Sequence, residues 1–255
     1  MQLRFFILIA FSLSVFLSLF AKSSAPPLSY PFRDISQPVV KDYRFQQIII
    51  LSTNRVGSTL VYMIFQYLFE DTLKDHEAFG KKVVKCHVLD PSSLLLRQPR
   101  TYFVIPVRNP IDAFCSLLKA FGVFDEKGVL KLLNEFVDYH LEFKKTIDVL
   151  NKRRSIFLRY EEFNERFDVI FDTLKQRFDI EISAEEKEKI NIFFSKDAVT
   201  GYAKDFNSFY ERDSVIGVHG NHISPDRRTL EELLPERTVI EIYRKLIPIL
   251  NMYGY

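Results

Sequence analysis

A short polar turn between two apolar stretches constrains the fold of this chain more than any other sequence feature. The run Ile48–Leu51 is uninterrupted and apolar, which indicates a buried strand, and the mostly apolar stretch Leu60–Phe69 indicates a helix. The turn between them, Ser52–Thr59 (STNRVGST), contains one glycine and one cation. Because free backbone N–H groups in the first turn of a helix attract anions, the sequence predicts a phosphate-binding turn here.

The turn does not match the P-loop of nucleoside triphosphatases, in which Gly-Lys-Ser/Thr follows an earlier glycine after four residues. Ser52 stands at the position of the first glycine, no lysine follows Gly57, and the cation Arg55 precedes that glycine. For this segment alone, the simpler alternative stays open: an ordinary strand-to-helix turn in which Ser58 or Thr59 is the N-cap.

A second anion-binding pattern follows the apolar run Tyr102–Ile105, which is typical of an interior parallel strand. Asn109 and Pro110 suit the N-cap and first turn of a helix, so Arg108 is expected at the carboxyl end of the strand. Ser116 lies about two turns into that helix. The guanidinium and this hydroxyl could therefore converge on one phosphate, whereas an arginine taken alone is more often a surface ion-pair residue.

In these segments the chain resembles the sulfotransferases that use 3′-phosphoadenosine-5′-phosphosulfate (PAPS). Arg55–Thr59 (RVGST) is similar to their 5′-phosphosulfate loop, and Arg108–Pro110 with Ser116 is similar to their 3′-phosphate motif at matching spacing. Further segments carry the resemblance: Lys85–His87 (KCH) is similar to the Lys-Thr-His segment of cytosolic members, Leu158–Glu162 (LRYEE) to the Tyr-Glu-Asp segment, and 212–224 to the C-terminal nucleotide-binding loop.

The resemblance implies transfer of a sulfuryl group from PAPS to a hydroxyl or amine acceptor, without a metal and with 3′-phosphoadenosine-5′-phosphate (PAP) as product. It implies that His87 is the general base. It also implies that Lys85 and Arg55 stabilise the charge that develops on the departing phosphate. The implied nucleotide-binding residues are Arg55, Gly57, Ser58 and Thr59 for the 5′ end, Arg108 and Ser116 for the 3′-phosphate, and Tyr160 and Arg212.

Some of these residues have plainer alternatives. A histidine near a strand end is often only a hydrogen-bonded structural side chain. The observation that favours catalysis is Lys85, two residues before His87, because alternate residues share one side if the strand persists through both. Tyr160 either contacts nucleotide or caps a strand. His219 and His222 lack Cys or carboxylate neighbours at ligand spacing, so we expect a loop role and not a metal site.

The N-terminal region predicts an attachment to membranes. Residues 5–21 form an uncharged apolar stretch, short for a spanning helix and long for a signal-peptide core. Pro26 disfavours cleavage just before it, so we expect a signal-anchor within 1–21, a Pro-rich stem over 22–41 and a catalytic domain over 42–255. Similarity to Golgi sulfotransferases implies a single-pass Golgi membrane protein with a lumenal catalytic domain; secretion after signal-peptide cleavage is the alternative.

The charge balance of the chain argues against one class of binding partner. The 35 basic and 33 acidic residues nearly cancel to +2, which argues against a nucleic-acid-binding surface. A hydroxyl-bearing acceptor is expected, with a glycan favoured by the anchor. Cys86 and Cys115 are the only cysteines. A lumenal setting permits a disulfide, but both lie in candidate site segments, so two unlinked, buried thiols are expected.

Strands that alternate with helices place the chain in the α/β class. We expect a three-layer, P-loop-like fold, in which helices flank a mostly parallel sheet and the site lies beyond the carboxyl ends of the strands. The patterns predict a strand at Ser155–Arg159 and helical stretches at Val129–Leu150, Glu161–Phe178, Ala184–Phe194 and Glu236–Leu250.

Two other functions stay open. A nucleotide kinase on the same sheet would depend on magnesium and ATP, and the missing Gly-Lys-Ser/Thr together with Arg108 and Ser116 argues against it. A noncatalytic protein of the same fold would bind PAPS without turnover.

Overall fold

A computed structural model of the chain describes residues 45–74, 80–87, 100–204 and 226–255. Within these ranges, no helix has both the length and the apolar character needed to span a bilayer. Several sequence-based expectations lie outside the described residues: the signal-anchor within 1–21, the stem over 22–41, Arg212 with the segment 212–224, and His219 and His222.

The centre of the fold is a parallel sheet with the strand order β2-β1-β3-β4. The strands are β1 (Gln47–Leu51), β2 (Lys82–Cys86), β3 (Thr101–Val107) and β4 (Ser155–Arg159). Each neighbouring pair is parallel, with Ile50 of β1 opposite Lys85 on one side and Val104 on the other. All of β3 is buried, as is β1 from its second residue onward, which explains their continuous apolar sequences.

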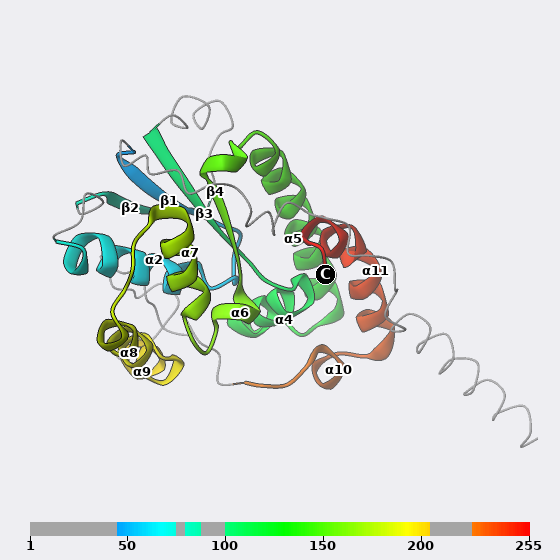
Figure 1. Cartoon of the computed structure of the whole chain (residues 1–255). Coiled ribbons are helices and arrows are strands. Elements are labelled where there is room, and N and C mark those ends of the chain that lie inside the picture. Colours follow the sequence, from blue (N-terminus) through cyan, green and yellow to red (C-terminus); the bar gives the residue numbers. More distant parts are fainter. Residues whose placement is uncertain (1–44, 75–79, 88–99, 205–225) are drawn as a thin grey trace, which may run out of the picture. The chain divides into compact units, whose positions relative to one another are not determined.

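Helices cover both faces of the sheet, so the predicted three-layer α/β architecture is confirmed (Figure 1). One face carries α2 (Ser58–Gln66) and α7 (Asp168–Phe178), and the other carries α4 (Pro110–Phe121), α5 (Glu126–Asp148) and α11 (Glu236–Tyr253). The chain runs from β1 to β2 in one direction and then resumes at β3 on the other side of β1. Because such crossovers are right-handed, this reversal places α2 and α4 on opposite faces.

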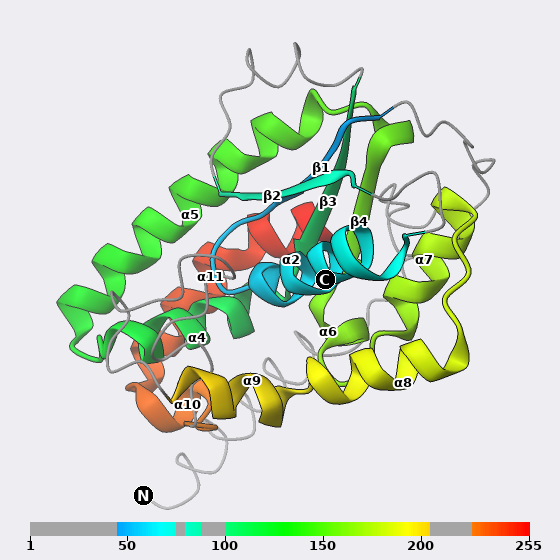
Figure 2. The ribbon, with the colours of Figure 1, turned by 90° about the vertical axis from the view of Figure 1, so that its left-hand side faces the viewer.

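Each face has its own apolar core. On the α2 side, Ile48 and Ile50 of β1 pack with α2, α7, α8 (Ala184–Phe193) and α9 (Lys196–Ala203). Figure 2 looks onto this side, with α2 in front of the sheet. The other core joins α4, α5 and α11 with α10 (Leu230–Leu233). The remaining elements are the π-helix η2 (Tyr67–Thr72), the 3₁₀ helix η4 (Lys152–Arg154) and the short helix α6 (Tyr160–Phe163).

Two predicted helices differ from those observed. The stretch expected over 60–69 begins earlier, as α2, and continues into η2. The stretch expected over 161–178 is divided into α6 and α7. At this break the backbone N–H of Phe167 donates to the side chain of Asn191 in α8 at 3.2 Å. A tertiary contact therefore replaces helical hydrogen bonding at the break.

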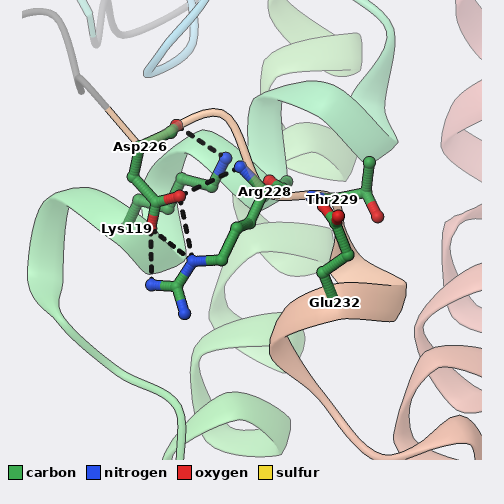
Figure 3. A network of polar contacts seen from close by, with 6 residues as sticks. Lys119, Asp226, Arg228, Thr229 and Glu232 are labelled. Carbon is green, nitrogen blue, oxygen red and sulfur yellow. Dashed lines mark hydrogen bonds and ion pairs between the residues drawn. The ribbon is translucent and has the colours of Figure 1, made fainter.

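The segment 226–229 is hydrogen-bonded to α4 (Figure 3). Lys119 Nζ donates to the Asp226 carbonyl at 3.0 Å, and Cys115 Sγ donates to the Arg228 carbonyl at 3.7 Å. Within the segment, Arg228 pairs with Asp226 at 2.7 Å and lowers the pKa of that carboxyl to about 2. Thr229 then forms a capping box with Glu232 at the start of α10. These contacts hold the chain against the helix that carries Ser116.

Candidate anion-binding site

The candidate site lies at the carboxyl ends of β1 and β3. These neighbouring strands lead to helices on opposite faces, α2 and α4. At such a point the two connections diverge and leave room for a ligand beyond the sheet. Arg55 follows β1 and Arg108 follows β3, so the two predicted anion-binding segments meet at this position.

The turn after β1 is shaped by backbone conformations that favour glycine. Gly57 has φ 79°, and Arg55 has φ 65°. Gly57 is the N-cap of α2, its carbonyl accepts the first helical hydrogen bond, from Val61 N at 3.1 Å, and no side chain caps this end. The simpler alternative, with Ser58 or Thr59 as the N-cap, is therefore wrong. The first N–H groups of α2 remain available for an anion.

Gly57 also permits a close contact with Tyr160. A Cβ atom added to Gly57 would lie 2.6 Å from Cδ2 and 2.9 Å from Cε2 of the Tyr160 ring. Tyr160 is the first residue of α6, directly after β4. Its ring therefore connects the end of β4 with the turn that follows β1. From the sequence, Tyr160 was considered as a nucleotide contact or a strand cap, and its contact with Gly57 was not foreseen. A role for Tyr160 in nucleotide binding stays a prediction.

Two arginines, a serine and a tyrosine meet beside this turn. Arg55 Nε donates to Ser116 Oγ at 3.1 Å, and Arg108 Nη1 donates to the Arg55 carbonyl at 3.3 Å. The Arg108 guanidinium lies over the Tyr160 ring, 4.5 Å from its centroid, in a cation–π arrangement. The structure thus joins the segment after β1 to the one after β3, and Arg55 contacts the same serine that was assigned to the 3′-phosphate.

Among the described residues, no carboxylate balances the charges of this cluster. Burial, followed by the neighbouring charge of Arg108, lowers the pKa of Arg55 to about 10. In the described part of the chain, neither Arg55 nor Arg108 forms an ion pair with a carboxylate. Two adjacent cations, one of them largely buried, repel each other and lose hydration, so an anion bound between them would be favourable.

Lys85 and His87 lie beside the start of α2. Lys85 Nζ donates to Thr59 Oγ1 at 2.5 Å, and His87 Nδ1 lies 3.1 Å from the Ser52 carbonyl. The argument from alternation required the strand to continue through both Lys85 and His87. Because β2 ends at Cys86, it includes Lys85 but not His87, and this condition is not met. The backbone beyond Cys86 has left the ladder, and the His87 ring is placed by Ser52 instead.

The surroundings of Nδ1 favour one tautomer of His87. The Ser52 carbonyl, 3.1 Å from Nδ1, only accepts hydrogen bonds, whereas the Ser52 hydroxyl, 3.4 Å from Nδ1, can donate or accept. The shorter contact favours a proton on Nδ1, which leaves the Nε2 lone pair for proton transfer. Burial and then the charge of Lys85 lower the pKa of His87, and the Ser52 carbonyl opposes them in part. The ring is therefore neutral at physiological pH, which is the state a general base requires.

Two residues around the site, Tyr139 and Tyr255, were not identified from sequence, and Glu161 was included only as part of the segment Leu158–Glu162, without a contact of its own. Glu161 Oε1 accepts from Asn109 N at 2.8 Å, and its other oxygen accepts from the Tyr255 hydroxyl at 2.7 Å. Tyr139 of α5 donates to the His87 carbonyl. Their partners are far away along the chain, and neither periodicity nor a motif connects residues at such separations.

The described residues contain no group of three or more His, Cys, Asp or Glu side chains that could hold a metal ion. Cys86 and Cys115 form no disulfide, as expected, but only Cys115 is buried, while Cys86 is half-buried. The prediction that the reaction needs no metal stays a prediction.

Comparison of the sequence with protein families and with curated proteins finds no match. The fold, however, is similar to solved structures. A structure of mouse sulfotransferase SULT7A1 complexed with PAP has a TM-score of 0.53 at 16% identity, covering 86% of this chain and 89% of that one. Retinol dehydratase, in complex with androsterone and inactive cofactor PAP, has a TM-score of 0.53 at 13% identity and covers 80% of each chain. The chain therefore has the fold that these PAP-bound proteins share.

Proposed function

We propose that this protein is a sulfotransferase that moves a sulfuryl group from PAPS to a hydroxyl or amine acceptor. One observation carries the proposal: the guanidinium groups of Arg55 and Arg108 gather at Ser116 and Tyr160 without a carboxylate partner in the described structure. This is the arrangement expected of a phosphate site. The fold shared with PAP-bound proteins supports it.

The two anionic ends of PAPS can be assigned to separate parts of the site. We assign the 3′-phosphate to Arg108, Arg55 and Ser116. The 5′-phosphosulfate is assigned to the start of α2, where Ser58 and Thr59 add hydroxyls to the free N–H groups. ATP and ADP lack the 3′-phosphate. The arginine pair would therefore distinguish PAPS from the nucleotides that a kinase uses.

The transfer step needs a base and a stabilised leaving group. In our proposal, His87 Nε2 takes the proton of the acceptor hydroxyl while its oxygen attacks sulfur. The bond between sulfur and the bridging phosphate oxygen breaks, and PAP leaves with the electron pair. We assign to Lys85, which donates to Thr59, the stabilisation of the negative charge that grows on the departing oxygen.

The acceptor and the cellular setting are proposed from sequence. The apolar stretch 5–21 supports an anchor, and an anchored enzyme of this kind would face the Golgi lumen, where glycans are available as acceptors. We therefore propose a glycan hydroxyl as the acceptor.

Calorimetric titration of the full chain with PAP, ADP and magnesium-ATP tests the donor site. We expect the wild type to prefer PAP. Arg108→Ala should weaken PAP binding by about 10- to 100-fold, because charged hydrogen bonds contribute about 1.5–3 kcal/mol, while ADP binding should change little. Arg153→Ala is the matched control, since Arg153 is an exposed arginine in η4, at the amino end of β4.

Three results would argue against the proposal. An equal loss of ADP and PAP affinity in Arg108→Ala would remove the 3′-phosphate assignment. Preference for magnesium-ATP would favour a kinase. Tight PAP binding without transfer from labelled PAPS to any hydroxyl acceptor would favour a noncatalytic binding protein.

A further inference from the structure

His87 lies where the sheet no longer holds the backbone. β2 is an edge strand, with β1 as its only neighbour in the sheet of the described structure. The hydrogen bond from Ser52 N to the Cys86 carbonyl, at 3.2 Å, connects the two strands just before His87. The position of His87 must therefore be fixed by contacts other than the strand ladder.

One such contact comes from α5, on the face of the sheet opposite α2. The Tyr139 hydroxyl donates to the His87 carbonyl at 2.5 Å. Burial, with a smaller contribution from Cys86, raises the pKa of Tyr139 to about 12. The phenol therefore stays protonated at physiological pH and remains a hydrogen-bond donor.

Tyr139 is followed by a buried residue that contacts α11. The next residue, His140, is 1% exposed, and its Nδ1 is hydrogen-bonded to the Tyr253 hydroxyl of α11 at 2.9 Å. The rings of Tyr139 and His140 meet edge to face, 6.3 Å apart. The hydroxyl that holds His87 thus extends from the packed α5–α11 layer and not from a loop.

We infer that Tyr139 is a positioning residue for His87. The hydroxyl of Tyr139 fixes the main chain at residue 87, and the Ser52 carbonyl fixes the imidazole ring. One hydrogen bond to the main chain and one to the ring restrict both the backbone and the side-chain torsions of His87. This inference rests on the proposed function, because it concerns the base of that reaction, but the geometry that carries it is independent of the reaction.

Tyr139→Phe tests the inference by removing only the hydroxyl. We expect kcat to fall about tenfold, as for a base that has lost one positioning hydrogen bond. PAP affinity should stay within about twofold of the wild type, since the contacts of Tyr139 are with His87 and His140 and not with the arginine pair assigned to the 3′-phosphate. In nitrogen-15 spectra of the imidazole, wild-type His87 should show the Nδ1-protonated tautomer, and the variant should show a mixture of tautomers.

Tyr67→Phe is the matched control. It also removes a phenol hydroxyl, one that donates to Glu186 at 2.8 Å in the α8 region, and it should change neither kcat nor the His87 spectrum. An unchanged His87 spectrum in Tyr139→Phe would overturn the inference, as would a loss of PAP affinity equal to the loss of kcat. If the wild type transfers no sulfuryl group, the proposed function fails, and the tautomer spectra still decide whether Tyr139 positions His87.

Discussion

At the residue scale, the candidate site combines unpaired positive charge with a neutral imidazole. Arg55 and Arg108 carry charge that the described protein does not neutralise, whereas burial and Lys85 keep His87 uncharged. These two states suit opposite tasks: cations bind a phosphorylated ligand, and a neutral ring accepts a proton. In the proposed reaction, binding and proton transfer would therefore fall to different residues of this site.

This separation predicts the effect of His87→Ala. We expect turnover to fall by about 10²- to 10⁴-fold, as for loss of a general base, while calorimetry shows PAP affinity within about twofold of the wild type. Because the pKa of His87 is lowered from its ordinary value of 6.5, wild-type activity should rise with pH through a midpoint below 6.5 and fall as the ring becomes protonated at lower pH. A parallel loss of PAP affinity would indicate a structural role for His87.

At the scale of elements, sequence patterns predicted the long segments better than the junctions. β4 was expected over Ser155–Arg159 and has those bounds. The division between α6 and α7 could not be seen, because it depends on the side chain of Asn191 in another helix. The short helices α9 and α10 were missed, since a few residues give little periodicity.

The turn before α2 gives a prediction at this scale. Gly57→Ala should lower the free energy of unfolding by about 2–4 kcal/mol, because a left-handed backbone costs an L-residue about 1–2 kcal/mol and the clash with Tyr160 adds to it. It should also weaken PAP binding. Urea unfolding and calorimetry measure the two effects.

Gly122→Ala separates these two contributions. Gly122 ends α4 with φ 64° and has open space where a Cβ would lie, so its replacement carries the backbone cost without a clash. Equal losses of stability in the two variants would mean that the contact with Tyr160 is unimportant.

At the scale of the whole molecule, the site depends on all four strands. Arg55, Lys85, Arg108 and Tyr160 come from β1, β2, β3 and β4 or from the residues that follow them. Arg108 and Ser116 could be proposed together from the sequence because both belong to one strand–helix unit, whereas the contact that the structure gives Ser116 is with Arg55, which follows another strand. The contact of Tyr139 with His87 could not be proposed, because only the packing of α5 against the sheet brings them together.

Buried His140 gives the whole molecule a predicted pH dependence. Burial lowers its pKa to about 3, so below pH 6.5 the unfolded chain takes up a proton that the folded chain does not. The free energy of unfolding should therefore fall by about 1.4 kcal/mol per pH unit from about pH 6.5 towards pH 3, or about 2 kcal/mol between pH 7 and pH 5.

Urea titrations at the two pH values measure this loss, with His140→Gln as the comparison. Glutamine can still hydrogen-bond to Tyr253 and does not titrate in this range. The variant should therefore lose about 2 kcal/mol less than the wild type between pH 7 and pH 5. An identical pH dependence in both proteins would show that His140 is not responsible.

The position of the site between β1 and β3 would also link binding of the proposed nucleotide to folding. A nucleotide that bridges the turn after β1 and the strand end after β3 can bind only a chain in which the crossovers on both faces are complete. A chain with a single crossover formed would have half of the site, and the unfolded chain would have neither half in place. Nucleotide present at 100 times its Kd would thus add about 2.7 kcal/mol to the stability of the complete fold alone. Under the proposed function, the supply of donor in a cell would then influence how much of this protein survives, as well as how fast it works.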